Sequence, residues 1–167
     1  MKRRFKLKVN GECPRSLLLA YFLAKLKSDV YICNISKISN IENDHQIFLF
    51  SNFLKNILVK YDIWNEFEDI SYGFNSLSIK DNLVSEQLLI RPENLSKNYL
   101  NNIGWTAIYS DIKRLLINQL LCLDNVHFIL KNQLIDKTLK FDYEFNFNNN
   151  NFFNSYKFPL SLLKRKD

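Results

Sequence analysis

The segment GECPRS, residues 11–16, has the composition of a phosphate-binding turn between a strand and a helix. In such turns one glycine allows a tight bend, a second lets the backbone approach a pyrophosphate, and a third lets helix and strand pack closely. These places fall on Gly11, Cys13 and Ser16, so only the first is a glycine. The start of the following helix would still offer N–H groups and a partial positive charge, and Arg15 could pair with a phosphate.

A second position bears on the same chemistry. Dinucleotide sites use an acidic residue at the end of the second strand to hold a ribose hydroxyl. In VYICN, residues 30–34, this place is taken by Asn34, which can form hydrogen bonds but has no charge. The pattern therefore leaves two interpretations open, a nucleotide site or a purely structural strand–turn–helix, and by itself it favours the second.

Other types of chemistry find little support in the sequence. His45 and His127 lack the neighbouring Cys, His, Asp or Glu residues that a metal site needs. Ser16 has no GxSxG context and no histidine that could be proposed as its base. We therefore predict no metal site, and no catalytic residue can be identified.

The elements that would position the turn form a β-α-β pattern. Phe5 to Val9 alternates as a strand does, Leu17 to Leu26 is an apolar run typical of a buried helix, and Val30 to Ile35 is β-branched and aromatic. Parallel strands require such a crossover, which is nearly always right-handed. The predicted fold class is α/β, with a Rossmann-like β-α-β core and additional strands.

The rest of the chain supplies further expected elements. In chain order these are a helix capped by Ser51, strands in FNSLSIKD and SEQLLI around a turn at Asp81-Asn82, an extended segment from Ile103 to Tyr109, a helix capped by Ser110-Asp111, a strand from Val126 to Leu130, and an alternating segment from Leu139 to Phe147 that Asn148 to Asn151 could turn into a hairpin. We predict one folded unit over residues 1–147 and an Asn/Phe-rich, basic tail over residues 148–167.

Composition limits the possible partners and compartment. The net charge of +6 and pI near 9.2 permit nucleic-acid binding, but much of the excess lies in the terminal runs MKRR and LLKRKD. There is no RNP-like motif, so we do not expect a nucleic-acid partner. Three cysteines without CxxC spacing indicate a reducing compartment. The longest apolar run is too short to span a bilayer, which favours a cytoplasmic protein, with a location peripheral to a membrane left open.

Taken in order, four segments resemble the N-terminal part of the FAD-dependent aromatic hydroxylases, in particular the ubiquinone-biosynthesis branch. They are VNGECPRSLLLAYFLAKL, LFSNFLKNILVKYDIWNEFEDI, FNSLSIKD and NIGWTAIYSDIKRLLINQLL. The resemblance covers about Phe5 to Phe147. It implies an FAD reduced by NAD(P)H that, with oxygen, hydroxylates an aromatic quinone precursor. For FAD it implies Gly11, Cys13, Arg15 and Ser16 at the pyrophosphate and Asn34 at the ribose.

The same resemblance implies an incomplete site. Full members of the family continue into an Asp-Gly motif and a Gly-Asp-Ala-Ala-His-type motif, and neither occurs in this sequence. We therefore expect a divergent, truncated relative whose activity alone is doubtful. The alternative is a non-catalytic interaction module that docks with a partner chain through an exposed apolar face, completing the fold.

Overall fold

The computed structural model describes residues 4–36, 46–80, 87–91, 102–135 and 138–147. Its elements, in chain order, are β1 (Lys6–Asn10), α1 (Pro14–Lys25), β2 (Asp29–Ile35), β3 (Ile47–Ser51), α2 (Asn52–Lys60), α3 (Trp64–Glu68), β4 (Ser71–Phe74), β5 (Leu77–Lys80), β6 (Gln87–Ile90), β7 (Gly104–Ile108), α4 (Tyr109–Leu121), β8 (Val126–Leu130) and β9 (Tyr143–Asn146). The chain is thus a mixed α/β fold, as predicted.

Four parallel strands form the first sheet, in the order β8-β2-β1-β9. In β1, Leu7 and Val9 are buried while the intervening Lys8 is only half-buried, which is the period-2 pattern of a strand with one face in the core. The predicted β-α-β unit is confirmed, since β1 pairs with β2 in parallel and α1 connects them. All carboxyl ends of this sheet therefore meet at one edge.

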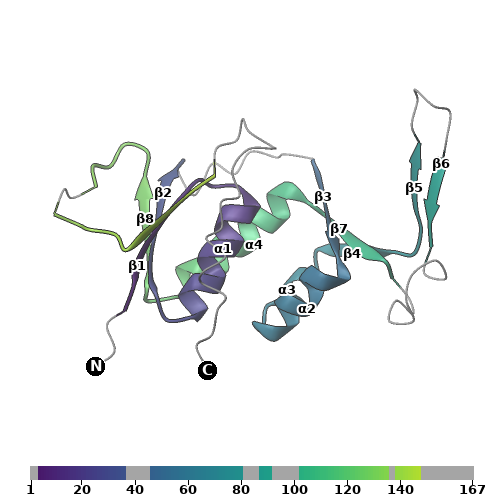
Figure 1. The fold of residues 1–167 in the computed structure, drawn as a ribbon, viewed down its shortest axis with the longest axis horizontal. Coiled ribbons are helices and arrows are strands. Elements are labelled where there is room, and N and C mark those ends of the chain that lie inside the picture. The colour runs from purple at the N-terminus through teal and green to yellow at the C-terminus, as the bar shows by residue number, and fades with distance from the viewer. Residues whose placement is uncertain (1–3, 37–45, 81–86, 92–101, 136–137, 148–167) are drawn as a thin grey trace.

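Helices α1 and α4 pack against each other and cover one face of the parallel sheet (Figure 1). Leu17, Ala20 and Tyr21 of α1 are at most 1% exposed, and Leu116 and Leu120 of α4 are fully buried. Their spacing of three to four residues places them on one side of each helix. Pro14 fits at the start of α1 because that position has no intrahelical partner for its missing N–H.

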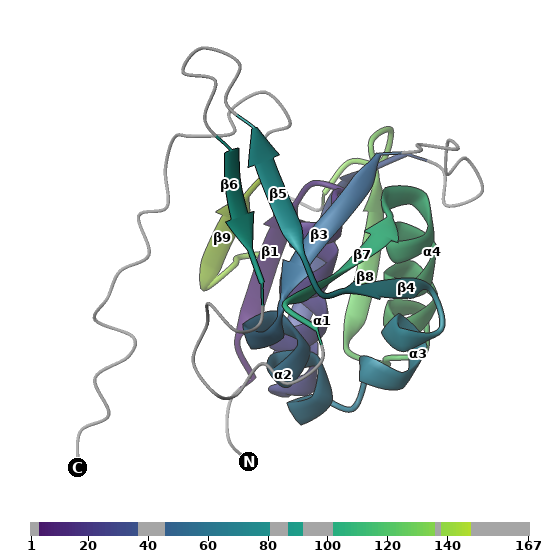
Figure 2. The same ribbon diagram turned by 90° about the vertical axis from the view of Figure 1, so that its right-hand side faces the viewer.

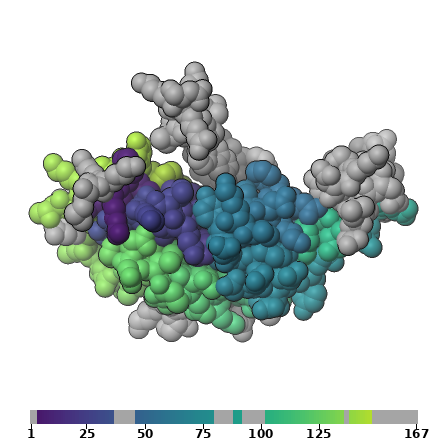
Figure 3. Space-filling view, turned by 90° about the horizontal axis from the view of Figure 1, so that it is seen from below, coloured from purple at the N-terminus to yellow at the C-terminus, as the bar shows by residue number. Residues whose placement is uncertain are grey.

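The central part of the chain forms a second, antiparallel sheet in the order β3-β7-β4. Phe50 and Trp105 from this sheet pack with Trp64 from α3, and one continuous core reaches from them to the parallel sheet. Helices α2 and α3 lie beside α1 and α4 on one continuous surface (Figure 3). The hairpin of β5 and β6 stands at the end of the molecule opposite the parallel sheet (Figures 1 and 2).

Several details differ from the sequence-based prediction. Strand β3 is an element that the sequence did not predict. Helix α4 begins at Tyr109 with Ile108 as its N-cap, so Ser110 is a buried helical residue and not a cap. Ser51 does precede α2, yet its side chain makes no capping hydrogen bond. The turns expected at Asp81-Asn82 and at Asn148 to Asn151 lie outside the described residues.

Within the described ranges, no helix is long and apolar enough to cross a membrane.

Candidate nucleotide-binding turn

Gly11 makes the bend between β1 and α1. Its φ of +123° lies in a region that side-chain-bearing residues rarely adopt. Its N–H donates to the carbonyl oxygen of Cys33 at 3.1 Å, which ties the bend to β2. A Cβ atom here would lie only 3.0 Å from the carbonyl oxygen of Phe147, which follows β9. Both conformation and space therefore require glycine at this place.

Cys13 and Ser16 fill the second and third glycine places with small buried side chains. Cys13 is the N-cap residue of α1, and Ser16 lies in its first turn. The Ser16 hydroxyl donates to the carbonyl oxygen of Cys13 at 2.7 Å, and the Cys13 Sγ lies 3.5 Å from Ser16 Oγ. Because the hydroxyl is satisfied inside the turn, helix and strand pack closely without a third glycine.

The N-terminus of α1 retains the features that favour an anion. No described side chain caps it, and no acidic residue lies in its first turn. Arg15 is exposed in that first turn. A helix N-terminus without a capping carboxylate presents N–H groups and a partial positive charge to phosphate.

Asn34 lies at the carboxyl end of β2, where the sequence placed the ribose ligand. Its side chain is exposed, and its Nδ2 lies 3.5 Å from Asn10 Oδ1 at the end of β1. Asn10 in turn donates through Nδ2 to Asn146 Oδ1 at the end of β9. The structure therefore brings Asn34 to the same sheet edge as the turn that contains Gly11, Cys13, Arg15 and Ser16.

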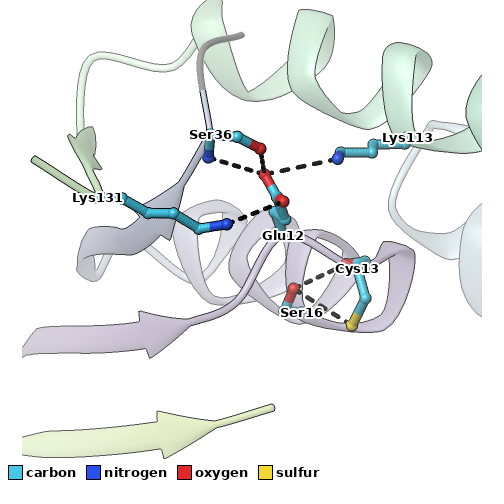
Figure 4. Close-up of polar contacts among 6 residues, drawn as sticks. All are labelled: Glu12, Cys13, Ser16, Ser36, Lys113 and Lys131. Carbon is cyan, nitrogen blue, oxygen red and sulfur yellow. Dashed lines mark hydrogen bonds and ion pairs between the residues drawn. The ribbon is translucent and has the colours of Figure 1, made fainter. Parts of the chain in front are cut away.

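Glu12, which no sequence pattern singled out, makes polar contacts from the turn to three other segments (Figure 4). Its Oε2 accepts hydrogen bonds from the backbone N–H (2.9 Å) and the hydroxyl of Ser36, just after β2. Lys113 Nζ of α4 lies 3.5 Å from Oε2, and Lys131 Nζ, just after β8, lies 3.7 Å from Oε1. One side chain thus links the turn to β2, α4 and the end of β8.

The surroundings of Glu12 stabilise its charged form. Partial burial by itself raises the pKa of the carboxyl, but hydrogen bonds from Ser36 and the charges of Lys113 and Lys131 outweigh burial and hold the pKa below its usual value. With one carboxylate and two ammonium groups, the cluster carries a net charge of about +1 at neutral pH. No sequence signal pointed to it, since both lysines lie about a hundred residues or more from Glu12.

Metal binding finds no support in the part of the chain that the structure describes, where no three His, Cys, Asp or Glu side chains gather closely enough to hold an ion.

The fold is similar to that of several solved enzyme structures. p-Nitrophenol 4-monooxygenase PnpA from Pseudomonas putida DLL-E4 matches 79% of the chain with a TM-score of 0.59 and 16% identity. PqsL, a probable FAD-dependent monooxygenase from Pseudomonas aeruginosa, matches 84% with a TM-score of 0.58 and 11% identity. PyrE3, a Diels-Alderase of pyrroindomycin biosynthesis, matches 78% with a TM-score of 0.58 and 12% identity.

This similarity defines a fold and not an activity. At such low identities the common feature is the arrangement of elements, and a monooxygenase and a Diels-Alderase both use it. The chain spans 33%, 37% and 26% of the three solved chains, respectively. No family model and no curated protein matches the sequence. The class that these findings support is an α/β fold similar to FAD-dependent monooxygenases.

Proposed function

We propose that the chain binds the ADP part of FAD at the turn between β1 and α1, as a divergent relative of the FAD-dependent monooxygenases. The observation that carries this proposal is Gly11 at φ +123°, just after a central parallel strand and two residues before the N-cap of a helix that has no capping side chain. Ligands of open α/β sheets bind outside the carboxyl ends of the strands, next to such turns.

The residues of the turn fit a pyrophosphate. Gly11 sets the bend, the backbone at Cys13 and Ser16 leads into α1, and the exposed Arg15 adds a positive charge. Asn34 and its neighbour Asn10 offer hydrogen bonds, without charge, to a ribose. These residues would bind and orient FAD, while the cofactor itself would supply the redox chemistry.

The substrate class belongs to the same proposal. The resemblance to ubiquinone-biosynthesis hydroxylases supports an aromatic quinone precursor as the ring to be hydroxylated, with NAD(P)H as the reductant. Because this chain corresponds to about a third of the monooxygenases that it resembles in fold, we propose that it binds the nucleotide and that catalysis needs further elements.

A titration of the purified chain with FAD, followed by flavin fluorescence, tests the proposal. Arg15→Glu should weaken binding about tenfold, because a favourable charge near the phosphates becomes repulsive. Lys140→Glu is the matched control, since Lys140 is exposed and precedes β9, at the opposite end of the sheet from the turn. The control should bind as the wild type does.

Two results would contradict the proposal. In one, the wild-type chain shows no saturable binding of FAD or ADP. In the other, Arg15→Glu and Lys140→Glu weaken binding equally, which would indicate a nonspecific effect of charge.

A second candidate function, a protein-interaction module, is favoured by the outer face of the antiparallel sheet. Ile47 and Leu49 of β3 and Tyr72 of β4 are 72%, 51% and 75% exposed. Ile108 of β7 pairs with Ile47 across the sheet, and Thr106 pairs with both Leu49 and Tyr72, so these side chains share one face. Exposed apolar patches of this type often mark protein interfaces.

For this second function we propose a further copy of the chain as the partner, because two such uncharged faces can bury each other about a twofold axis. Light scattering over a range of concentrations would show a dimer for the wild type and a monomer for Leu49→Lys. Val59→Lys, at an equally exposed position of α2, is the control and should not change the mass. A wild type that stays monomeric at all concentrations would exclude this function.

A further inference from the structure

Three carboxamide side chains form a row along the carboxyl edge of the parallel sheet. Asn34, Asn10 and Asn146 are at or near the ends of β2, β1 and β9, which are neighbours in the sheet. Nδ2 of Asn34 lies 3.5 Å from Oδ1 of Asn10, and Nδ2 of Asn10 donates to Oδ1 of Asn146. The row therefore crosses β1. From β1 the chain runs to β2 on one side and later returns to form β9 on the other side, and open α/β sheets usually bind their ligands at such a reversal of strand order.

A β-bulge directs Asn34 into this row. Cys33 pairs with Ile129 and Ile35 pairs with Leu130, which leaves Asn34 without a partner in β8. Its φ of +63° is left-handed, a conformation that asparagine tolerates better than most residues but that remains uncommon. Bulges next to binding sites often re-aim a side chain. Here the bulge turns the side chain of Asn34 away from the β8 ladder and toward Asn10.

The two ends of the row remain able to bind a ligand. Within the described residues, Oδ1 of Asn34 and Nδ2 of Asn146 have no hydrogen-bond partner, and both side chains are exposed. The row thus offers an acceptor at one end and a donor at the other, which suits hydroxyl groups because a hydroxyl can both donate and accept. None of the three side chains carries a charge.

The charges around Asn34 are favourable to an anion. The nearby carboxylate, Glu12, is held by Lys113 and Lys131. The backbone N–H of Lys131 donates to the carbonyl oxygen of Ile35 at 3.0 Å, one residue after Asn34, and more than half of the Lys131 side chain is exposed. A second carboxylate of this sheet, Glu144, is also paired, since its Oε2 lies 3.1 Å from Lys8 Nζ. The balance beside Asn34 is therefore positive.

We propose that this row of asparagines takes the place of a ribose-binding carboxylate and thereby admits an adenine nucleotide whose ribose carries a 2′-phosphate. A carboxylate at the end of β2 binds ribose hydroxyls but repels a phosphate, whereas a carboxamide beside a net positive cluster accepts both. Asn34 is the specificity-determining residue of the site. The inference rests on the proposed nucleotide site and adds a second class of ligand that the site accepts beside FAD, whose own adenosine ribose carries no 2′-phosphate.

Calorimetric titration of the whole chain with 5′-AMP, adenosine 2′,5′-bisphosphate and 5′-ADP tests this inference. The wild type should bind the 2′,5′-bisphosphate at least as tightly as 5′-AMP. Asn34→Asp should weaken the 2′,5′-bisphosphate about tenfold relative to 5′-AMP, while 5′-ADP controls for the added phosphate charge. Asn56→Asp, an exposed position on α2, introduces the same charge elsewhere and should leave the ratio unchanged.

The outcomes separate this inference from the proposed function. If the nucleotides bind but the wild type rejects the 2′-phosphate, or if Asn34→Asp leaves the ratio unchanged, the inference is wrong and the nucleotide site stands. If neither the three nucleotides nor FAD binds, both are overturned. A selective loss for the 2′,5′-bisphosphate in Lys131→Gln would support the inference further, because it would show that the charge of the ammonium group favours the 2′-phosphate.

Discussion

The carboxyl edge of the parallel sheet and the outer face of the antiparallel sheet differ in what their side chains contact. At the edge, Glu12 and Ser16 are held by hydrogen bonds and ion pairs from within the chain. On the outer face, the apolar side chain of Leu49 and the aromatic side chain of Tyr72 are largely exposed. The polar groups of Glu12 and Ser16 are thus satisfied within the chain, whereas the outer face leaves apolar surface in contact with water.

This difference predicts which substitutions lower the stability of the fold and which do not. A region whose groups contact one another loses stability when any one of them changes, because a partner is left unsatisfied. A face in contact with water tolerates changes, unless another molecule covers it. The following predictions test whether the contrast holds in solution.

The largest effect is expected from a buried leucine next to the turn, compared with an exposed leucine on the outer face. Leu17→Ala on α1 should lower the free energy of unfolding by about 2–5 kcal/mol, because Leu17 is fully buried. Leu49→Ala, on the outer face, should change it by less than about 0.5 kcal/mol. Urea unfolding measures both. A cost for Leu49→Ala that approaches that of Leu17→Ala would mean that the outer face is covered in solution.

Glycine substitutions should give the next largest contrast. Gly11→Ala should cost about 1–3 kcal/mol, because it combines a positive φ with a Cβ 3.0 Å from the carbonyl oxygen of Phe147. For Gly73→Ala on β4, the three atoms nearest to the new Cβ all belong to the side chain of Asn102, which can move, so about 1 kcal/mol or less is expected. Thermal unfolding of the two variants compares them. Equal losses would show that the turn is less constrained than the structure indicates.

A third prediction concerns the ammonium group of Lys55, which lies over two tryptophan rings on the inner side of the antiparallel sheet. Its Nζ lies 4.6 Å from the ring centroid of Trp64 and 4.5 Å from that of Trp105. Lys55→Met keeps the length of the side chain but removes the charge, and should cost about 0.5–2 kcal/mol. Tryptophan emission should change at the same time. Lys60→Met, in the last turn of the same helix and exposed, serves as the control; a similar cost there would rule out a specific role of the indoles.

The smallest effect concerns pH and the Glu12 cluster. Since the pKa of Glu12 is lower in the folded chain than in the unfolded chain, its stabilising contribution is complete above the unfolded value and is lost as pH falls through the folded value. Glu12→Gln should cost about 1 kcal/mol near pH 7 and progressively less below about pH 4. Denaturant midpoints measured from pH 3 to 7 would show this convergence. A difference that does not vary with pH would contradict an ionic role.

The sequence predicted the local part of this architecture well. The β-α-β unit followed from alternation in β1 and the apolar run of α1, because both patterns reflect burial of one face of a single element. Strand β9 also lies within the alternating segment that was predicted. Strand β3 was not predicted because it is short and runs directly into α2. The period-2 pattern of the strand and the helical pattern therefore overlap within LFSNFL.

The candidate site was predictable only in its local part. Gly11, Cys13, Arg15 and Ser16 are close in sequence, so their common turn could be inferred from spacing. The contacts of Glu12 with Lys113 and Lys131 and the row from Asn34 to Asn146 depend on how distant strands are ordered in the sheet. That order is set by packing over the whole chain, and single residues carry no signal of it.

The pairing of β9 with β1 has a consequence for how the chain folds. Backbone hydrogen bonds join Asp142 to Lys6 and Phe147 to Asn10, across 136 and 137 positions of sequence. During synthesis β1 and β2 can pair early, but the other side of β1 stays an open edge until residue 147 has left the ribosome. Contacts between such distant positions form slowly, and an open parallel edge can recruit other nascent chains. Expression yield should therefore depend on translation rate and chaperone supply more than the stability of the finished fold would suggest.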